Sequence, residues 1–185
     1  MVNEIKSTAK DGMEKALVAL ANELKKIRTG RANVSMVDNV KVNYYGTLTP
    51  LSQVGSVSTP DAKTILISPW ESSLLKEIEA GILKSDVGMS PVNDGKVIRL
   101  KVPELTEQRR KDLVKSMKKH VEDAKVAVRM VRRDANDHLK TALKDKKISE
   151  DENKRIQEDV QKQTDQYIEK VDKMAADKEK DLMTF

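Results

Sequence analysis

Apolar residues recur in alternating steps of four and three near the start of the chain. The series is Met13, Leu17, Leu20, Leu24 and Ile27. This heptad spacing is typical of a helix that packs lengthwise against other helices. Gly30 follows the series, and glycine readily takes the left-handed conformation that ends many helices. The pattern therefore predicts a first helix that ends near Gly30.

Two more helices are predicted in the last eighty residues. The second begins after Thr106 as N-cap, and its seam is Leu113, Met117, Val121, Ala124, Val128, Val131, Ala135 and Leu139. The third opens with a Ser149–Glu152 capping box, and its seam is Ile156, Val160, Tyr167, Val171 and Met174. Only a few residues around Lys147 separate them, and short links join antiparallel neighbours. The three seams together predict a three-helix bundle.

The middle of the chain has a different pattern. Val40, Val42 and Tyr44 alternate as on one face of a strand before a turn at Gly46. Residues 54–58, 63–67 and 97–102 suggest further strands. Helical spacing is seen at Leu74, Leu75, Ile78, Ile82 and Leu83. This segment predicts a small α/β domain of short strands with one helix.

Glycine and proline sharpen the division, because both interrupt helices. All five prolines lie between Pro50 and Pro103, and neither residue occurs from Thr106 onward. We expect an α+β protein: a bundle from residues 1–30 and 105–185, with residues 31–104 inserted as a small domain. The chain crosses between them at Gly30–Arg31 and at Val102, Pro103 and Glu104. A hinge and a fixed two-domain body both remain open.

Composition narrows the class of protein. Charged residues make up 35% of the chain and aromatic residues 3%, which suits long amphipathic helices better than one large core. Cysteine is absent, which excludes disulfides, a thiolate nucleophile and cysteine-bound metal. No apolar run suits a signal peptide or a membrane span, so we expect a cytoplasmic protein without a membrane segment, and a monomer.

The net charge of +5 is unevenly distributed. The predicted second helix and the turn after it carry a net charge of +7, the third helix −4, and the inserted domain zero. Pairing between neighbouring helices, or ordinary solvated faces, would explain part of this asymmetry. A binding surface for an anionic partner is the other interpretation.

Clustered arginines favour the binding surface. Arg129, Arg132 and Arg133 lie within about one turn of helix, and Arg132 is the nearest to the apolar seam. Arg109 and Arg110 occupy the first turn of their helix, where the helix dipole disfavours cations. Arginine binds phosphate through a planar fork, so these residues point to recognition of RNA by shape and phosphates.

Two further arginines, Arg28 and Arg31, end the first predicted helix and extend this basic stripe. Other chemistry is weakly indicated. His120 and His138 are expected at the flank of the seam rather than at a metal, and no cofactor motif is present. Tyr44, Tyr45 and Trp70 suit base stacking, although we expect them in the core of the small domain.

Several stretches resemble the bacterial ribosome recycling factor family from end to end. They are KIRTGRA (26–32), VNYYGTLTPL (42–51), LTEQRRKDLVK (105–115), VAVRMVRRDAN (126–136), LKDKKISEDE (143–152) and the C-terminal ADKEKDLMTF. The stretch SPWESS (68–73) is less typical of the family, so it leaves the partner-facing detail of the small domain open.

The resemblance implies an L-shaped protein of nearly tRNA-like dimensions, with a three-helix bundle and a small β/α/β domain on a flexible double linker. It implies a factor without an active site that splits post-termination ribosomes with elongation factor G, using GTP hydrolysed by that factor. The bundle would bind large-subunit rRNA, and the small domain would face elongation factor G. The family's arginines fall on Arg28, Arg31, Arg109, Arg110, Arg129, Arg132 and Arg133.

Two other readings remain beside this one. The first is a non-catalytic helical adaptor or scaffold whose charges only keep it in solution. The second is an enzyme with an unrecognised carboxylate site. Binding to purified large ribosomal subunits separates the adaptor from the translation factor.

Overall fold

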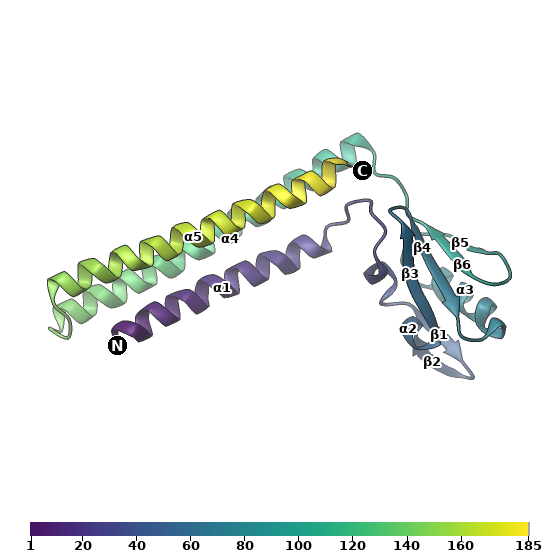
Figure 1. Ribbon diagram of the computed structural model, residues 1–185, viewed down its shortest axis with the longest axis horizontal. Coiled ribbons are helices and arrows are strands. Elements are labelled where there is room, and N and C mark those ends of the chain that lie inside the picture. The colour runs from purple at the N-terminus through teal and green to yellow at the C-terminus, as the bar shows by residue number, and fades with distance from the viewer. Residues whose placement is uncertain (185) are drawn as a thin grey trace. The chain divides into compact units, whose positions relative to one another are not determined.

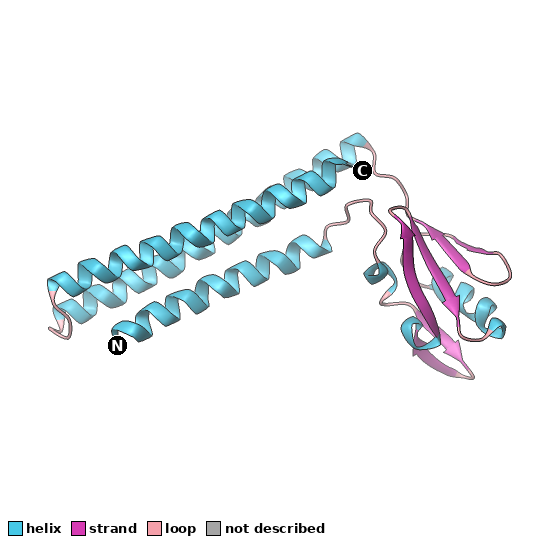
Figure 2. Cartoon of the chain, viewed as in Figure 1, coloured by secondary structure: helices cyan, strands magenta, loops and turns pink. Residues whose placement is uncertain are grey.

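A computed structural model describes residues 1–184, and the chain divides into two compact units. The first unit comprises residues 1–28 and 106–184, and the second comprises residues 29–105. Figure 1 traces the elements in chain order, and Figure 2 distinguishes the helical unit from the unit that holds the strands. Among residues 1–184, no helix is long and apolar enough to cross a membrane.

The first unit is a bundle of three long helices. They are α1 (Val2–Lys26), α4 (Glu107–Lys144) and α5 (Glu150–Thr184). α4 runs antiparallel to both of the others (Figure 1). The predicted seams form the core, because Met13, Met117, Val128, Leu139 and Val160 are fully buried. Burying these stripes drives the association of helices that are otherwise strongly charged.

The predicted caps of α4 and α5 are confirmed. The Thr106 side chain accepts a hydrogen bond of 3.1 Å from the backbone N–H of Arg109. Ser149 and Glu152 form the reciprocal capping box. The Glu152 N–H donates a hydrogen bond of 3.2 Å to the Ser149 hydroxyl, and the Ser149 N–H donates one of 2.9 Å to the Glu152 carboxylate. Between the helices, Lys146 takes a left-handed conformation with φ of 58°, which turns the chain within a few residues.

The predicted end of the first helix is wrong by several residues. Helix α1 ends at Lys26, and Ile27 is already extended, with φ of −78° and ψ of 116°. Ile27 packs partly buried against the bundle core from this extended backbone, and β-branched residues lose side-chain freedom inside helices. Gly30 does have a positive φ of 80°, but it lies in the second unit and does not cap the helix.

The second unit contains two antiparallel sheets. Strands β1 (Lys41–Tyr44) and β2 (Thr47–Pro50) form a hairpin. The four-stranded sheet has the order β3-β4-β6-β5. Its strands are β3 (Gly55–Asp61), β4 (Thr64–Pro69), β5 (Pro91–Asn93) and β6 (Ile98–Lys101). The sequence pattern indicates β1, β3, β4 and β6 but not β2 or β5, which are short and have no buried residue.

Short helices connect and cover these strands. They are η1 (Val34–Val37), α2 (Leu51–Val54), η2 (Ser72–Leu74) and α3 (Leu75–Lys84). The core joins Ile65 and Ile67 of β4 and Ile98 of β6 to Ile78 and Ile82 of α3. α3 lies close to β1 because Gly81 has no side chain, and a Cβ there would stand 2.5 Å from the Lys41 carbonyl oxygen.

Candidate nucleic-acid interface

Arg132 lies at the edge of the bundle seam, as the spacing predicts. It is half-buried, whereas Arg129 and Arg133 are exposed. Its Nη1 donates a hydrogen bond of 3.3 Å to Oε1 of Gln161 on α5. The partner is a neutral amide and not an acid of the third helix, so this contact orients the guanidinium without neutralising its charge.

Arg129 and Arg133 differ from two lysines of the same helix, Lys118 and Lys125. Lys125 pairs with Asp172 at 2.6 Å and Lys118 pairs with Glu179 at 3.5 Å, which links α4 to α5. Among residues 1–184, Arg129 and Arg133 form no ion pair or side-chain hydrogen bond within the chain. Lysines therefore account for part of the charge asymmetry, while these arginines keep their donors available to an external anion.

The arginines of the first turn of α4 have different environments. Arg109 is exposed. Arg110 is half-buried, and its Nη1 donates a hydrogen bond of 2.7 Å to the backbone carbonyl of Leu182. Carbonyls at the end of a helix lack partners within it, so Arg110 fastens the last turn of α5 to the start of α4. This structural role of Arg110 is not visible in the sequence pattern.

Arg28 and Arg31 fall on opposite sides of the unit boundary. Arg28 belongs to the bundle unit and Arg31 to the small unit, and both side chains are exposed. The end of α1 and the start of α4 lie at the same end of the bundle (Figure 1). This end therefore gathers Arg28, Arg109 and Arg110, while Arg129, Arg132 and Arg133 lie further along α4.

We expected the three aromatic residues of the small domain in its core, and this is wrong for Tyr45 and Trp70. Tyr45 is 78% exposed and Trp70 is 66% exposed, while Tyr44 is half-buried. Tyr45 and Gly46 both have positive φ, of 47° and 87°, which is the two-residue turn that hairpins favour. Its tip places Tyr45 outside the core, where aliphatic side chains already fill the space.

The tyrosine hydroxyls both approach one carboxylate. Tyr45 donates to Oε2 of Glu71 at 3.1 Å and Tyr44 approaches Oε1 at 3.5 Å. The Glu71 carboxylate raises the pKa of Tyr45, first through this hydrogen bond and then through its charge. The acid beside these rings makes them poor stacking partners for a phosphate-bearing strand.

The histidines show no sign of a metal site. His120 is half-buried at the flank of the seam and His138 is exposed. Within residues 1–184, no group of three or more histidine, aspartate or glutamate side chains is arranged to hold a metal ion.

A sequence profile described as "Ribosome recycling factor" matches residues 20–183. The chain belongs to the ribosome recycling factor family. Similar proteins named ribosome-recycling factor occur in Bdellovibrio bacteriovorus, at 61% identity over 99% of this chain and 98% of the relative, and in Legionella pneumophila, at 50% identity over 99% of each. A third, from Nitratidesulfovibrio vulgaris, is 55% identical over 95% of this chain and 94% of its own.

Solved structures of the ribosome recycling factor family share the fold. A solution structure is 38% identical, with a TM-score of 0.75 over 100% of this chain and 98% of that chain. The T. thermophilus ribosome recycling factor, described with the E. coli elongation factor G bound to the E. coli post-termination complex, is 40% identical, with a TM-score of 0.63 over 99% of each chain. The chain is therefore a translation factor of two-domain α+β fold.

Proposed function

We propose that this chain splits post-termination ribosomes into subunits together with elongation factor G and GTP. Full-length similarity to ribosome-recycling factors supports this function, as does the similar T. thermophilus factor described with elongation factor G on the post-termination complex. The chain itself acts without an active site, as a cytoplasmic monomer, and the elongation factor hydrolyses the GTP.

The bundle binds large-subunit rRNA in this proposal. The supporting observation is that Arg129 and Arg133 have no partner among the described residues, while Lys118 and Lys125 of the same helix are paired with acids of α5. Arg132 adds a guanidinium held by a neutral amide, and Arg28, Arg31 and Arg109 extend the set. We assign Arg110 a mixed role, because one of its donors already holds the end of α5.

The small domain faces elongation factor G and moves on a hinge at Gly30–Arg31 and Val102–Glu104. Gly30 has a left-handed backbone, a conformation that glycine adopts without strain, and this suits a bend in the first linker segment. On the second strand, Val102 donates a backbone hydrogen bond of 2.8 Å to Lys63, and Glu104 forms an ion pair with the Lys63 side chain. Because both contacts hold this segment to the small domain as far as Glu104, we place its moving part after Glu104, at the boundary between Leu105 and Thr106.

A subunit-splitting assay tests the function. Post-termination ribosomes are mixed with elongation factor G, GTP and the chain, and light scattering follows subunit release. We expect release only when all components are present. A non-catalytic adaptor or scaffold would neither bind purified large subunits nor support release, so absence of both results favours that alternative.

A further inference from the structure

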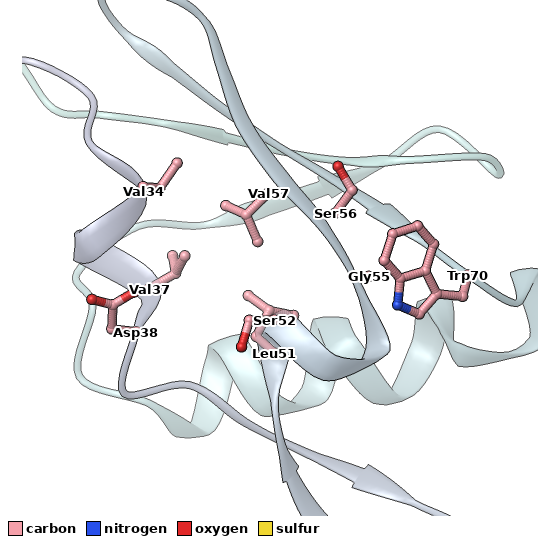
Figure 3. A pocket seen from close by; sticks show the side chains of 9 residues that line it. All are labelled: Val34, Val37, Asp38, Leu51, Ser52, Gly55, Ser56, Val57 and Trp70. Atoms are coloured by element: carbon pink, nitrogen blue, oxygen red, sulfur yellow. The ribbon is translucent and has the colours of Figure 1, made fainter.

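The small domain contains a partly apolar pocket beside β3, an edge strand of its four-stranded sheet. The pocket has a volume of about 580 Å³, and it is lined by Val34, Val37, Asp38, Leu51, Ser52, Gly55, Ser56, Val57 and Trp70. Figure 3 shows the valines of η1 across from Val57 on β3, with Trp70 beyond Gly55. We call this pocket the β3 groove. Asp38 is the one charged residue in its lining.

One side of the groove is the free edge of a sheet. β3 is the first strand in the order β3-β4-β6-β5, so only β4 pairs with it in this sheet. The Trp70 N–H donates to the Val54 carbonyl at 3.0 Å, which orients Val54 toward β4. Peptide groups alternate in direction along an antiparallel strand, so those of Gly55 and Val57 point away from β4.

The register of β3 with β4 also indicates that the peptide groups of Gly55 and Val57 point away from β4. Gly55 is opposite Pro69, and proline has no N–H to donate, so that position needs no ladder bond. The free edge is short, because the register shifts between Ser58 and Asp61 and Pro60 interrupts it. A segment of only a few residues therefore fits against Gly55–Val57, which protects the edge from indiscriminate pairing.

Trp70 gives the groove an exposed anchor. Its backbone is fixed to Val54, yet the residue is 66% exposed. Tryptophan is enriched among the residues that contribute most to protein interfaces. The small domain carries no net charge, and Asp38 would repel phosphate. The edge, the apolar walls and the acid thus suit an extended peptide with an apolar side chain and a neighbouring basic residue.

We infer that the β3 groove binds a short extended segment of elongation factor G, through the edge of β3 and an apolar side chain placed against Trp70. This inference rests on the proposed function, which makes elongation factor G the protein partner of the small domain. A basic residue beside the anchor faces Asp38, and this charge match distinguishes the site from a general apolar surface.

Trp70 is the one tryptophan of the chain, so it reports directly on the groove. Replacing it biosynthetically with 5-hydroxytryptophan allows selective excitation among other proteins. The labelled full chain is bound to post-termination ribosomes, and quenching by acrylamide is measured before and after adding elongation factor G with a non-hydrolysable GTP analogue. We expect the quenching constant to fall several-fold only after the elongation factor is added.

Substitutions test the same site independently. Ser52 is exposed on α2 at the wall of the groove, so Ser52→Phe fills the groove without removing a core contact. Ser73→Phe places the same ring on an exposed position outside it and serves as the control. We expect Ser52→Phe and Trp70→Ala to weaken recruitment of elongation factor G roughly tenfold or more, the loss that follows removal of a dominant interface contact. Melting temperatures and large-subunit binding should match those of the parent.

Three results overturn the inference. In the first, ribosomes alone protect Trp70 from acrylamide. In the second, the protection grows with the concentration of the free chain. In the third, Trp70 stays unprotected while splitting proceeds normally with GTP. The last contradicts the groove and leaves the proposed function standing. A parent chain that binds but never splits ribosomes contradicts the proposed function itself, and the inference with it.

Discussion

Arg132 on α4 and Gln161 on α5 are joined by a hydrogen bond of 3.3 Å from Nη1 to Oε1. Gln161 in turn donates from Nε2 to Asp165 at 2.9 Å. An amide held in this way directs the guanidinium and leaves its charge intact. The arginine nearest the seam is therefore oriented in advance, which lowers the entropy lost when it binds phosphate.

Substituting Arg132 by alanine should weaken binding to large subunits more than Arg129→Ala or Arg133→Ala. The expected loss is about 1–3 kcal/mol, as for a charge-assisted hydrogen bond. The slope of log affinity against log salt should also fall by about one, because one fewer phosphate is neutralised. Equilibrium binding to purified large subunits over a range of salt concentrations measures both quantities.

Gln161→Ala is the matched control for this prediction. It keeps the charge of Arg132 and removes only its orientation, so its effect on affinity should be smaller and its salt slope unchanged. Thermal unfolding of the same variants separates binding from stability. A large fall in the melting temperature of Arg132→Ala with unchanged affinity of the folded protein would assign Arg132 a structural role only.

The bundle alone, with Arg31 to Leu105 replaced by a short linker, should bind large subunits but fail to split ribosomes. Its three core clusters draw only on residues of the bundle unit, so the shortened chain retains its packing. Circular dichroism first confirms that it is folded. Full splitting activity from the shortened chain would show that the small domain is dispensable and the proposed division of labour is wrong.

A disulfide engineered between the two units should block splitting and leave large-subunit binding intact, because the proposed hinge could no longer move. The chain has no cysteine, so one cysteine introduced into each unit has no native competitor. The reduced protein is the control and should recover activity. Unimpaired splitting by the fully oxidised protein would argue for a fixed two-domain body.

The bundle was more predictable from sequence than the small domain because one repeating stripe specifies each helix. Met13, Val128 and Val160 follow that stripe and are fully buried. The end of α1 escaped the same reasoning, since Ile27 leaves the helix to pack from an extended backbone. A local helix stop such as Gly30 carries no information about that tertiary contact.

The candidate site was predictable in its residue types but not in its pairing. Spacing placed Arg132 nearest the seam, and the structure agrees. The spacing gave no sign that Gln161 would orient Arg132 or that Leu182 would accept a hydrogen bond from Arg110, because both partners lie on another helix. The exposure of Trp70 was missed because composition alone assigns large rings to a core, whereas β4 ends just before this residue.

Tyr167 on α5 offers a test of bundle stability. Its side chain is 4% exposed, and its hydroxyl donates a hydrogen bond of 2.7 Å to Oε2 of Glu14 on α1. This hydrogen bond, burial and the Glu14 charge raise the pKa of Tyr167 from 10.0 to about 12. Tyr167→Phe should lower the free energy of unfolding at neutral pH by about 1 kcal/mol, as measured by urea denaturation.

The pH dependence of that difference is the sharper observation. Because folding raises the pKa of Tyr167, the protonated hydroxyl stabilises the fold fully below about pH 10, and this contribution disappears as pH rises through about 12. The parent should therefore lose its advantage over Tyr167→Phe across this interval. Lysines also titrate there, but they do so in both proteins and cancel in the difference.

Glu14→Gln removes the negative charge and should return the Tyr167 pKa toward its ordinary value, so this variant should lose less stability over the same interval. A constant difference between the parent and Tyr167→Phe from neutral pH to about pH 12 would mean that the hydrogen bond to Glu14 contributes nothing to stability, and that the phenol ring acts only by packing against Met13 and Val128.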